Sequence, residues 1–193
     1  RPETEELVNL CANWAAAKKM QQAQLKIVEV GTGSGCIAIA LQKKLPSAQI
    51  TAVDISNEAI KVASANALAN KTAITFITLD FLDETCWPEL GKYDIIISNP
   101  PYIADIEKES MAKHVLDFEP HTALFVANNH SLIFYSAIAS FGNKYLNKGG
   151  ALFVEINQAM GLQTQDVFVQ NNYKTVLKKD LFDNDRMIVA TKK

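Results

Sequence analysis

Short apolar runs alternate along the chain with stretches in which apolar residues recur every three or four positions. Ile95–Ile97 is an uninterrupted apolar run, which indicates a strand covered on both faces. Leu7, Leu10, Cys11 and Trp14 instead recur at helical spacing, which indicates an amphipathic helix. This alternation predicts an α/β fold, because parallel strands need helical crossovers between them.

Seven strands are expected, and most of them alternate with helices. Only a polar loop separates the last two strands, so the last strand is expected to run antiparallel to its neighbours. The predicted fold class is therefore a doubly wound, seven-stranded, mostly parallel sheet. The strands are expected at residues 26–30, 49–53, 74–79, 95–97, 151–156, 173–178 and 187–191. Helices are expected at residues 3–19, 37–45, 131–146 and 158–170 and after Ser56, with a turn at 148–150 and irregular structure over 104–127.

Composition and charge exclude several classes of protein. A chain of 193 residues with 48% hydrophobic residues is expected to form one domain, spanning residues 1–193. Its formal net charge of −2 argues against binding nucleic acid by bulk electrostatics, and no apolar run is long enough to span a membrane. Cys11, Cys36 and Cys86 are expected to be reduced, buried thiols of a cytoplasmic protein. The histidines show no metal-ligand spacing, so no metal site is expected.

The apolar run at 95–97 leads into Ser98 and then into Asn99-Pro100-Pro101-Tyr102. Two prolines cannot continue a strand ladder, so this loop holds an amide and a phenol at the strand's carboxyl end, where ligands bind in such sheets. The Asn99 side chain and the Pro100 carbonyl can accept the two hydrogens of a flat –NH2 group, and Tyr102 can stack on its face. The loop equally fits a rigid turn with Tyr102 in the core.

A glycine-rich turn, Gly31-Thr32-Gly33-Ser34-Gly35, separates the strand at 26–30 from the helix that follows. Glycines let a ligand approach the backbone, and a helix N-terminus offers free N–H groups, so these five residues are candidate cofactor-binding residues. The spacing is G-x-G-x-G, which differs from the dinucleotide fingerprint G-x-G-x-x-G and from the phosphate-binding loop.

Two further strands end in carboxylates. Asp54 follows the second strand, where an acid can bind both hydroxyls of a ribose; its alternative is a turn or helix-capping acid. Asp80 and Phe81 follow the third strand. They can accept a hydrogen bond from an adenine amino group and cover the flat face of the base. Their alternative is a strand-end turn with a core phenylalanine.

Together these segments resemble a class I, Rossmann-like S-adenosylmethionine-dependent methyltransferase. The tetrapeptide at 99–102 resembles the NPPY motif of enzymes that methylate planar amides or exocyclic amines. The segment at 1–5 resembles RPETE of the PrmC/HemK family, and Val115 with residues 118–120 resembles its V-x-x-[FY]-E-P segment. Departures are Glu29 in place of a strand-end Asp, residues 127–130 in place of a Gly-rich stretch, and Asn157 in place of Gly.

The resemblance implies methyl transfer from S-adenosyl-L-methionine to the side-chain amide nitrogen (N5) of the glutamine in the Gly-Gly-Gln motif of peptide chain release factors. S-adenosyl-L-homocysteine is the implied product. Asn99, Pro100 and Tyr102 are the implied catalytic residues; with Pro101 they bind the substrate, and Asn99 also borders the cofactor. A cytoplasmic monomer that binds release factors, but neither nucleic acid nor membranes, is expected. The chain is expected to be a catalytic domain whose upstream helical domain is missing.

Three other functions fit parts of the pattern. An adenine-N6 nucleic-acid methyltransferase needs the same loop, but the acidic balance and the segments at 1–5 and 118–120 oppose it. A glutamine methyltransferase that acts on a ribosomal protein is closer, and the segment at 1–5 opposes it. A non-catalytic cofactor-binding partner of an assembly is opposed by the intact loop at 99–102.

Overall fold

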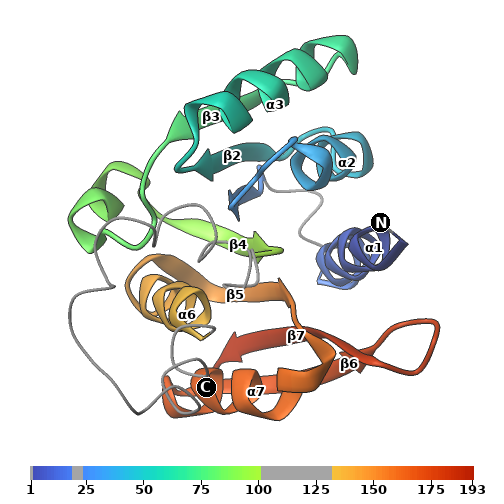
Figure 1. Cartoon of the computed structure of the whole chain (residues 1–193), viewed down its shortest axis with the longest axis vertical. Coiled ribbons are helices and arrows are strands. Elements are labelled where there is room, and N and C mark those ends of the chain that lie inside the picture. The colour runs from blue at the N-terminus through green and yellow to red at the C-terminus, as the bar shows by residue number, and fades with distance from the viewer. Residues whose placement is uncertain (1, 19–23, 101–131) are drawn as a thin grey trace, which may run out of the picture.

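The computed structural model describes residues 2–18, 24–100 and 132–193, and its centre is a seven-stranded sheet (Figure 1). The strand order is β3-β2-β1-β4-β5-β7-β6. Strands β1 to β5 pair in parallel, and β7 runs antiparallel to both of its neighbours, which confirms the predicted fold class. The strands are β1 (Lys26–Val30), β2 (Gln49–Asp54), β3 (Ile74–Thr78), β4 (Tyr93–Ser98), β5 (Leu146–Glu155), β6 (Tyr173–Lys179) and β7 (Asp185–Lys192).

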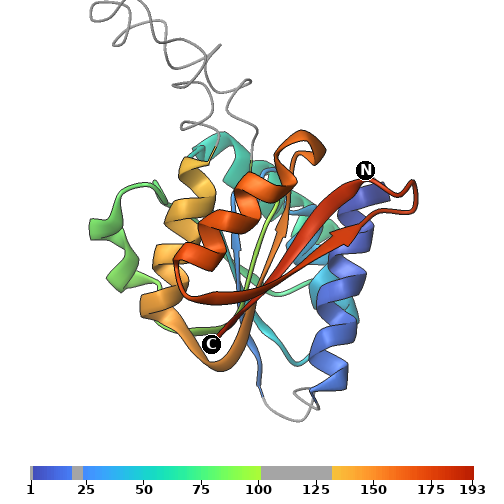
Figure 2. The same ribbon diagram turned by 90° about the horizontal axis from the view of Figure 1, so that it is seen from below.

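Helices cover both faces of the sheet, which explains why its central strands are continuously apolar (Figure 2). Ile95 and Ile97 pack into one core cluster with Leu41, and Ile96 packs into the opposite cluster with Phe141. The first face carries α1 (Pro2–Ala17), α2 (Cys36–Lys44) and α3 (Asn57–Ala69). The second carries the 3-10 turn η2 (Glu84–Glu89), α6 (Ile133–Tyr145), the short η3 (Gln158–Met160) and α7 (Gly161–Gln170). In the described part of the chain, no helix has the length and apolar character needed to cross a membrane.

The structure corrects the expected turn at residues 148–150. β5 already begins at Leu146, which pairs with Tyr93, and the next pair joins Ala151 to Ile95. Residues 147–150 therefore bulge opposite Asp94, and the Asn147 side chain donates to the Asp94 carboxylate at 2.9 Å. The predicted turn residues form a bulge inside a longer strand, where pairing continues on both sides.

Two other expectations need correction. The helix expected over 158–170 is divided into η3 and α7, because the backbone of Met160 is not helical, with φ −121° and ψ 18°. Asn157 caps η3 by accepting from the Ala159 N–H at 3.0 Å. Of the three cysteines, which are all free thiols, only Cys11 is buried; Cys36, the first residue of α2, is exposed, and Cys86 is half-buried. The irregular stretch expected at 104–127 and the histidines lie outside the described residues.

The chain reverses its direction of winding between β1 and β4, which lie side by side in the sheet although two other strands separate them in sequence. At their carboxyl ends Val30 pairs with Ser98, and the Ser98 hydroxyl donates to the Val30 carbonyl at 2.7 Å. The crevice outside such a switch point is where open α/β sheets bind ligands. The glycine-rich turn and the Asn99 loop both start here.

Candidate active site

The glycine-rich turn is attached to the end of β2. The N–H groups of Gly31 and Thr32 both donate to the Val53 carbonyl, at 2.9 and 3.0 Å. The Gly33 N–H donates to the Asp54 carboxylate at 2.8 Å. These three N–H groups are therefore occupied by protein acceptors, so the turn offers a ligand less free backbone than the sequence alone predicted.

Gly35 is the glycine of this turn where, besides a positive φ that it shares with Gly31 and Gly33, an added side chain would meet α3. Its φ is +80°, and an added Cβ would lie 3.0 Å from the Ala63 Cβ in α3. One helical turn further along α3, the Asn66 side chain donates to the Ser34 carbonyl at 2.9 Å. α3 thus contacts the turn at Ser34 and Gly35, while Gly33 and Ser34 are exposed residues.

Glu29 lies buried under the turn and organises it from below. Its Oε2 accepts from the Thr32 hydroxyl at 2.7 Å and from the Ala38 N–H at 3.1 Å. Burial raises the pKa of Glu29 to about 8; the two hydrogen bonds oppose this rise and the Asp54 charge adds to it. Glu29 Oε1 has no hydrogen-bond partner in the described chain. The Thr32 side chain faces the protein, so its hydroxyl supports the turn and does not face a ligand.

Asp54 stands at the tip of β2 and is half-buried. One carboxylate oxygen accepts from the Gly33 N–H, and the other accepts from the Ser56 N–H at 3.0 Å. Both contacts stabilise turns, which is the alternative role that the sequence left open for Asp54, namely that of a turn or helix-capping acid. Each oxygen keeps a second lone pair, so the same carboxylate can still accept from ligand hydroxyls.

The two candidate residues that follow β3, Asp80 and Phe81, differ in their exposure to solvent. Asp80 is exposed, and its side chain accepts from the Leu82 N–H at 2.9 Å. Phe81 is only 4% exposed, and its ring packs against Trp87 and Phe141 with centroids 5.7 and 5.2 Å apart. The Phe81 ring therefore has no face open to a base, which is the core placement that the sequence left as its alternative.

Sequence reasoning missed two apolar side chains at this edge of the sheet. Ile55 follows Asp54 and is 67% exposed, and Leu82 follows Phe81 and is 37% exposed. For Ile55 the available signal was a large apolar residue directly after a strand-end acid; Leu82 comes one position later and carried no such signal. These side chains offer the apolar surface that had been assigned to the Phe81 ring.

Asn99 and Pro100 follow β4 directly, beside the glycine turn, with Asn99 half-buried and Pro100 buried. The Asn99 Nδ2 donates to the Thr4 hydroxyl of α1 at 3.3 Å, and that hydroxyl donates to Glu155 at the end of β5 at 2.9 Å. Neither Thr4 nor Glu155 was selected from the sequence. Pro101 and Tyr102 lie outside the described residues, so their predicted roles stay predictions.

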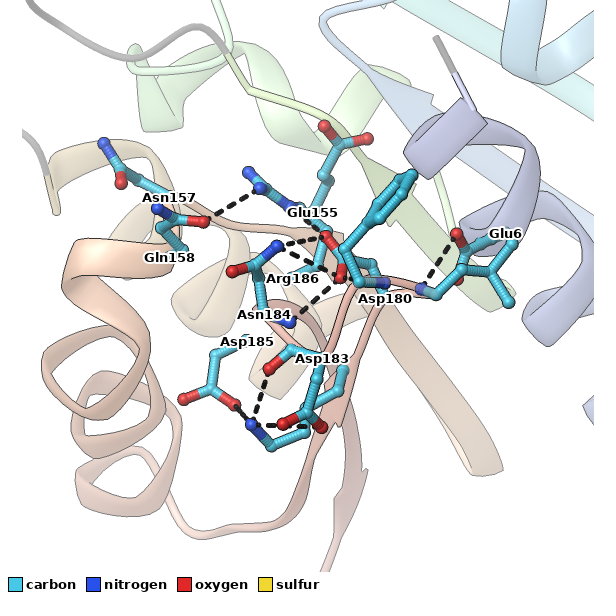
Figure 3. Close-up of polar contacts among 12 residues, drawn as sticks. Glu6, Glu155, Asn157, Gln158, Asp180, Asp183, Asn184, Asp185 and Arg186 are labelled. Atoms are coloured by element: carbon cyan, nitrogen blue, oxygen red, sulfur yellow. Dashed lines mark hydrogen bonds and ion pairs between the residues drawn. The ribbon is translucent and has the colours of Figure 1, made fainter.

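A second polar cluster lies beside Glu155 (Figure 3). Its centre is Asp180, which accepts from the N–H groups of Phe182 and Asn184 at 2.9 Å each and from Arg186 Nε at 3.3 Å. Burial alone would raise the pKa of Asp180, but these hydrogen bonds outweigh it, so the pKa lies below its usual value. The cluster holds the β6–β7 hairpin in a fixed shape at the edge of the site.

The switch point between β1 and β4, the G-x-G-x-G turn and the strand-end acids together define a class I methyltransferase fold. Consistently, the profile of the methyltransferase small domain family matches residues 15–125. The release factor glutamine methyltransferase of Flavobacterium psychrophilum is 45% identical to this chain, and the aligned region covers 97% of this chain and 65% of that protein. The enzyme of the same name from Bacteroides thetaiotaomicron is 42% identical and covers 100% and 67%. The chain belongs to the family of release factor glutamine methyltransferases, and it spans 65–67% of the length of these two relatives.

Solved structures support the same fold. A ribosomal protein L11 methylase from Lactobacillus delbrueckii subsp. bulgaricus matches with a TM-score of 0.69 and 21% identity, covering 100% of this chain and 80% of that one. Magnesium protoporphyrin IX methyltransferase from Synechocystis PCC 6803, solved with bound SAM, matches with a TM-score of 0.64 and 19% identity, covering 99% and 80%. At these identities the likeness concerns the fold alone.

Proposed function

We propose that this chain carries the chemistry of a protein-(glutamine-N5) methyltransferase. In this proposal it transfers a methyl group from S-adenosyl-L-methionine to the glutamine of the Gly-Gly-Gln motif of peptide chain release factors. The observation that carries the proposal is the position of Asn99, at the switch point directly beside the glycine turn, with its Oδ1 accepting no hydrogen bond from the described chain. The names of the relatives supply the substrate class.

The residues at the ends of β1, β2 and β3 fit this cofactor. Gly33 and Ser34 are exposed, and nothing lies within 4 Å of a Cβ added at Gly33, which leaves room for close approach. The remaining lone pairs of Asp54 suit the two ribose hydroxyls. Asp80 is exposed and suits the adenine amino group, while Ile55 offers an apolar surface to the base. When bound, the cofactor would supply an electrophilic methyl group and leave as S-adenosyl-L-homocysteine, while the methylated amide nitrogen would lose one N–H proton to solvent.

Asn99 and Pro100 act on the nucleophile. An amide nitrogen attacks poorly, because its lone pair is delocalised into the carbonyl group. Asn99 Oδ1 and the Pro100 carbonyl accept the two N–H bonds of the substrate amide, which orients it. As charge develops on the nitrogen, these hydrogen bonds strengthen, so they favour the transition state over the flat ground state. The proposed role of Tyr102 is to stack on the amide plane.

Mass spectrometry of a release factor after incubation with this protein and S-adenosyl-L-methionine tests the proposal. We expect one added methyl group on the glutamine of the Gly-Gly-Gln motif and none on a release factor in which that glutamine is replaced by alanine. An adenine-containing DNA and a ribosomal protein serve as competing substrates in parallel reactions. Methylation of either competitor without methylation of the release factor would overturn the proposed substrate class.

A further inference from the structure

Three side chains from three separate elements form a hydrogen-bonded chain at the site. The Asn99 Nδ2 at the end of β4 donates to the Thr4 hydroxyl in the first turn of α1, at 3.3 Å. The Thr4 hydroxyl donates to Glu155 Oε2 at the end of β5, at 2.9 Å. Thr4 and Glu155 are both buried, with 8% and 1% of their surfaces exposed. These hydrogen bonds thus link the Asn99 amide to the buried Glu155 carboxylate through the Thr4 hydroxyl.

Hydrogen-bond donation among these three side chains can run in only one direction, from Asn99 to Thr4 to Glu155. A carboxylate accepts hydrogen bonds, so the one hydroxyl hydrogen of Thr4 points to Glu155 and only its lone pairs face Asn99. The Asn99 side chain must then present its NH2 group to Thr4. The two ends of an asparagine amide have nearly the same shape, and only their partners distinguish them. The carboxylate therefore determines, through Thr4, which way the amide faces.

We infer that Thr4 is a positioning residue that turns Asn99 Oδ1 towards the substrate, an inference that rests on the proposed function. Because Nδ2 is held by Thr4, Oδ1 is left on the other side of the amide as an acceptor. An amide rotated by half a turn would present its NH2 group to the NH2 group of the substrate. Two donors would then face each other, and the substrate nitrogen would lose the acceptor that Asn99 provides.

The position of Thr4 does not depend on this hydrogen bond alone. Leu7, Val8 and Cys11 follow it in α1 and are almost fully buried against the sheet side of the helix. In the described structure, Glu6 also accepts from the Leu181 N–H of the β6–β7 hairpin at 3.4 Å. α1 is therefore held in place by several independent contacts. Replacing the Thr4 hydroxyl is expected to change the orientation of the Asn99 amide while leaving the position of α1 unchanged.

The test compares Thr4→Val, which keeps the branched shape without the hydroxyl, with Thr4→Ser, which keeps the hydroxyl. Kinetic constants are measured on a release factor at saturating S-adenosyl-L-methionine, and turnover is divided by the cofactor-binding stoichiometry from calorimetry, so that unfolded protein does not count. We expect Thr4→Val to lower kcat by about tenfold, as for the loss of one hydrogen bond, with cofactor affinity nearly unchanged. Thr4→Ser is expected to stay close to wild type.

If the Thr4 hydrogen bonds only hold α1 in place, Thr4→Val would lower the thermal stability but leave kcat per folded molecule unchanged. That result would overturn the inference. A double-mutant cycle gives a second decision. In an Asn99→Ala background Thr4→Val should have no further effect on kcat, because the group it orients is gone. An equal loss in both backgrounds would show that Thr4 acts independently of Asn99. If wild type itself transfers no methyl group to a release factor, the proposed function fails, which is a different outcome.

Discussion

Asp54 performs two tasks with one carboxylate. It closes the glycine turn and the start of α3 through backbone N–H groups at 2.8 and 3.0 Å, and in the proposed function it also holds the ribose. A residue with both tasks preorganises the site, because the ligand meets an acceptor that the protein already holds in place. Any change at Asp54 is therefore expected to affect the empty turn as well as the bound cofactor.

Asp54→Ala is expected to weaken S-adenosyl-L-methionine binding by about 2–4 kcal/mol, because a pair of charge-assisted hydrogen bonds is lost. Titration calorimetry measures the change. Asp83→Ala is a matched control, because Asp83 also accepts backbone and side-chain hydrogen bonds after a strand, from Thr85, but in the cap of η2. The control should bind the cofactor as wild type does. Unchanged affinity in Asp54→Ala would rule out the ribose role.

Asn99→Ala is expected to separate chemistry from cofactor binding. Its side chain is proposed to act most strongly in the transition state, so turnover should fall on the order of 100-fold while cofactor affinity changes little. Asn143→Ala removes an exposed asparagine of α6 and serves as the control. Single-turnover methyl transfer and calorimetry on both variants give the comparison. A loss of cofactor binding with preserved turnover would make Asn99 a cofactor ligand instead.

At the scale of elements, the glycine turn depends on how closely α2 and α3 approach. Gly35 touches Ala63 of α3, so this turn carries a packing constraint in addition to its backbone conformation. Such contacts are poorly visible in a sequence, since α3 lies more than twenty residues away. By contrast, the elements themselves were predictable, because both sheet faces are buried and the apolar runs mark the strands.

Gly35→Ala is expected to destabilise the protein by about 2–3 kcal/mol, through a positive φ and a clash with Ala63. Gly91→Ala is the matched control: its φ is +75° but an added Cβ meets nothing within 4 Å, so it should lose only about 1 kcal/mol. Urea denaturation of both variants measures the free energy of unfolding. Equal losses would show that the contact between the turn and α3 contributes nothing.

At the scale of the whole molecule, the sequence predicted which strand ends carry the candidate site residues, but not the contacts that cross between those strand ends. Asn99, Asp54 and the glycine turn were identifiable because each follows an apolar run at the carboxyl edge of the sheet. Thr4 and Glu155 were not, because they meet across 151 residues of chain and only the folded sheet brings them together. The Phe81 ring was expected to face a ligand, but it continues the alternation of Ile77 and Leu79 and packs with them into one core cluster. The expected monomer and the absence of nucleic-acid binding stay predictions.

Glu29 makes the stability of the whole fold depend on pH. Its pKa is raised by burial from 4.5 to about 8, so between these values the folded protein keeps a proton that the unfolded chain has lost. The contribution of Glu29 to stability is therefore complete below pH 4.5 and is lost as pH rises towards 8. The slope attributable to this group is at most ~1.4 kcal/mol per pH unit.

Glu29→Gln is expected to remove that slope, because an amide keeps an oxygen for the Thr32 hydroxyl and the Ala38 N–H but does not titrate. The difference in unfolding free energy between variant and wild type should therefore move in favour of the variant as pH rises from 5 to 8, by on the order of a few kcal/mol. Urea denaturation at each pH measures it. Glu58→Gln, which changes an exposed carboxylate paired with Lys61, is the control and should show almost no change with pH. A difference that stays constant across this range would mean that Glu29 is already ionised in the folded protein.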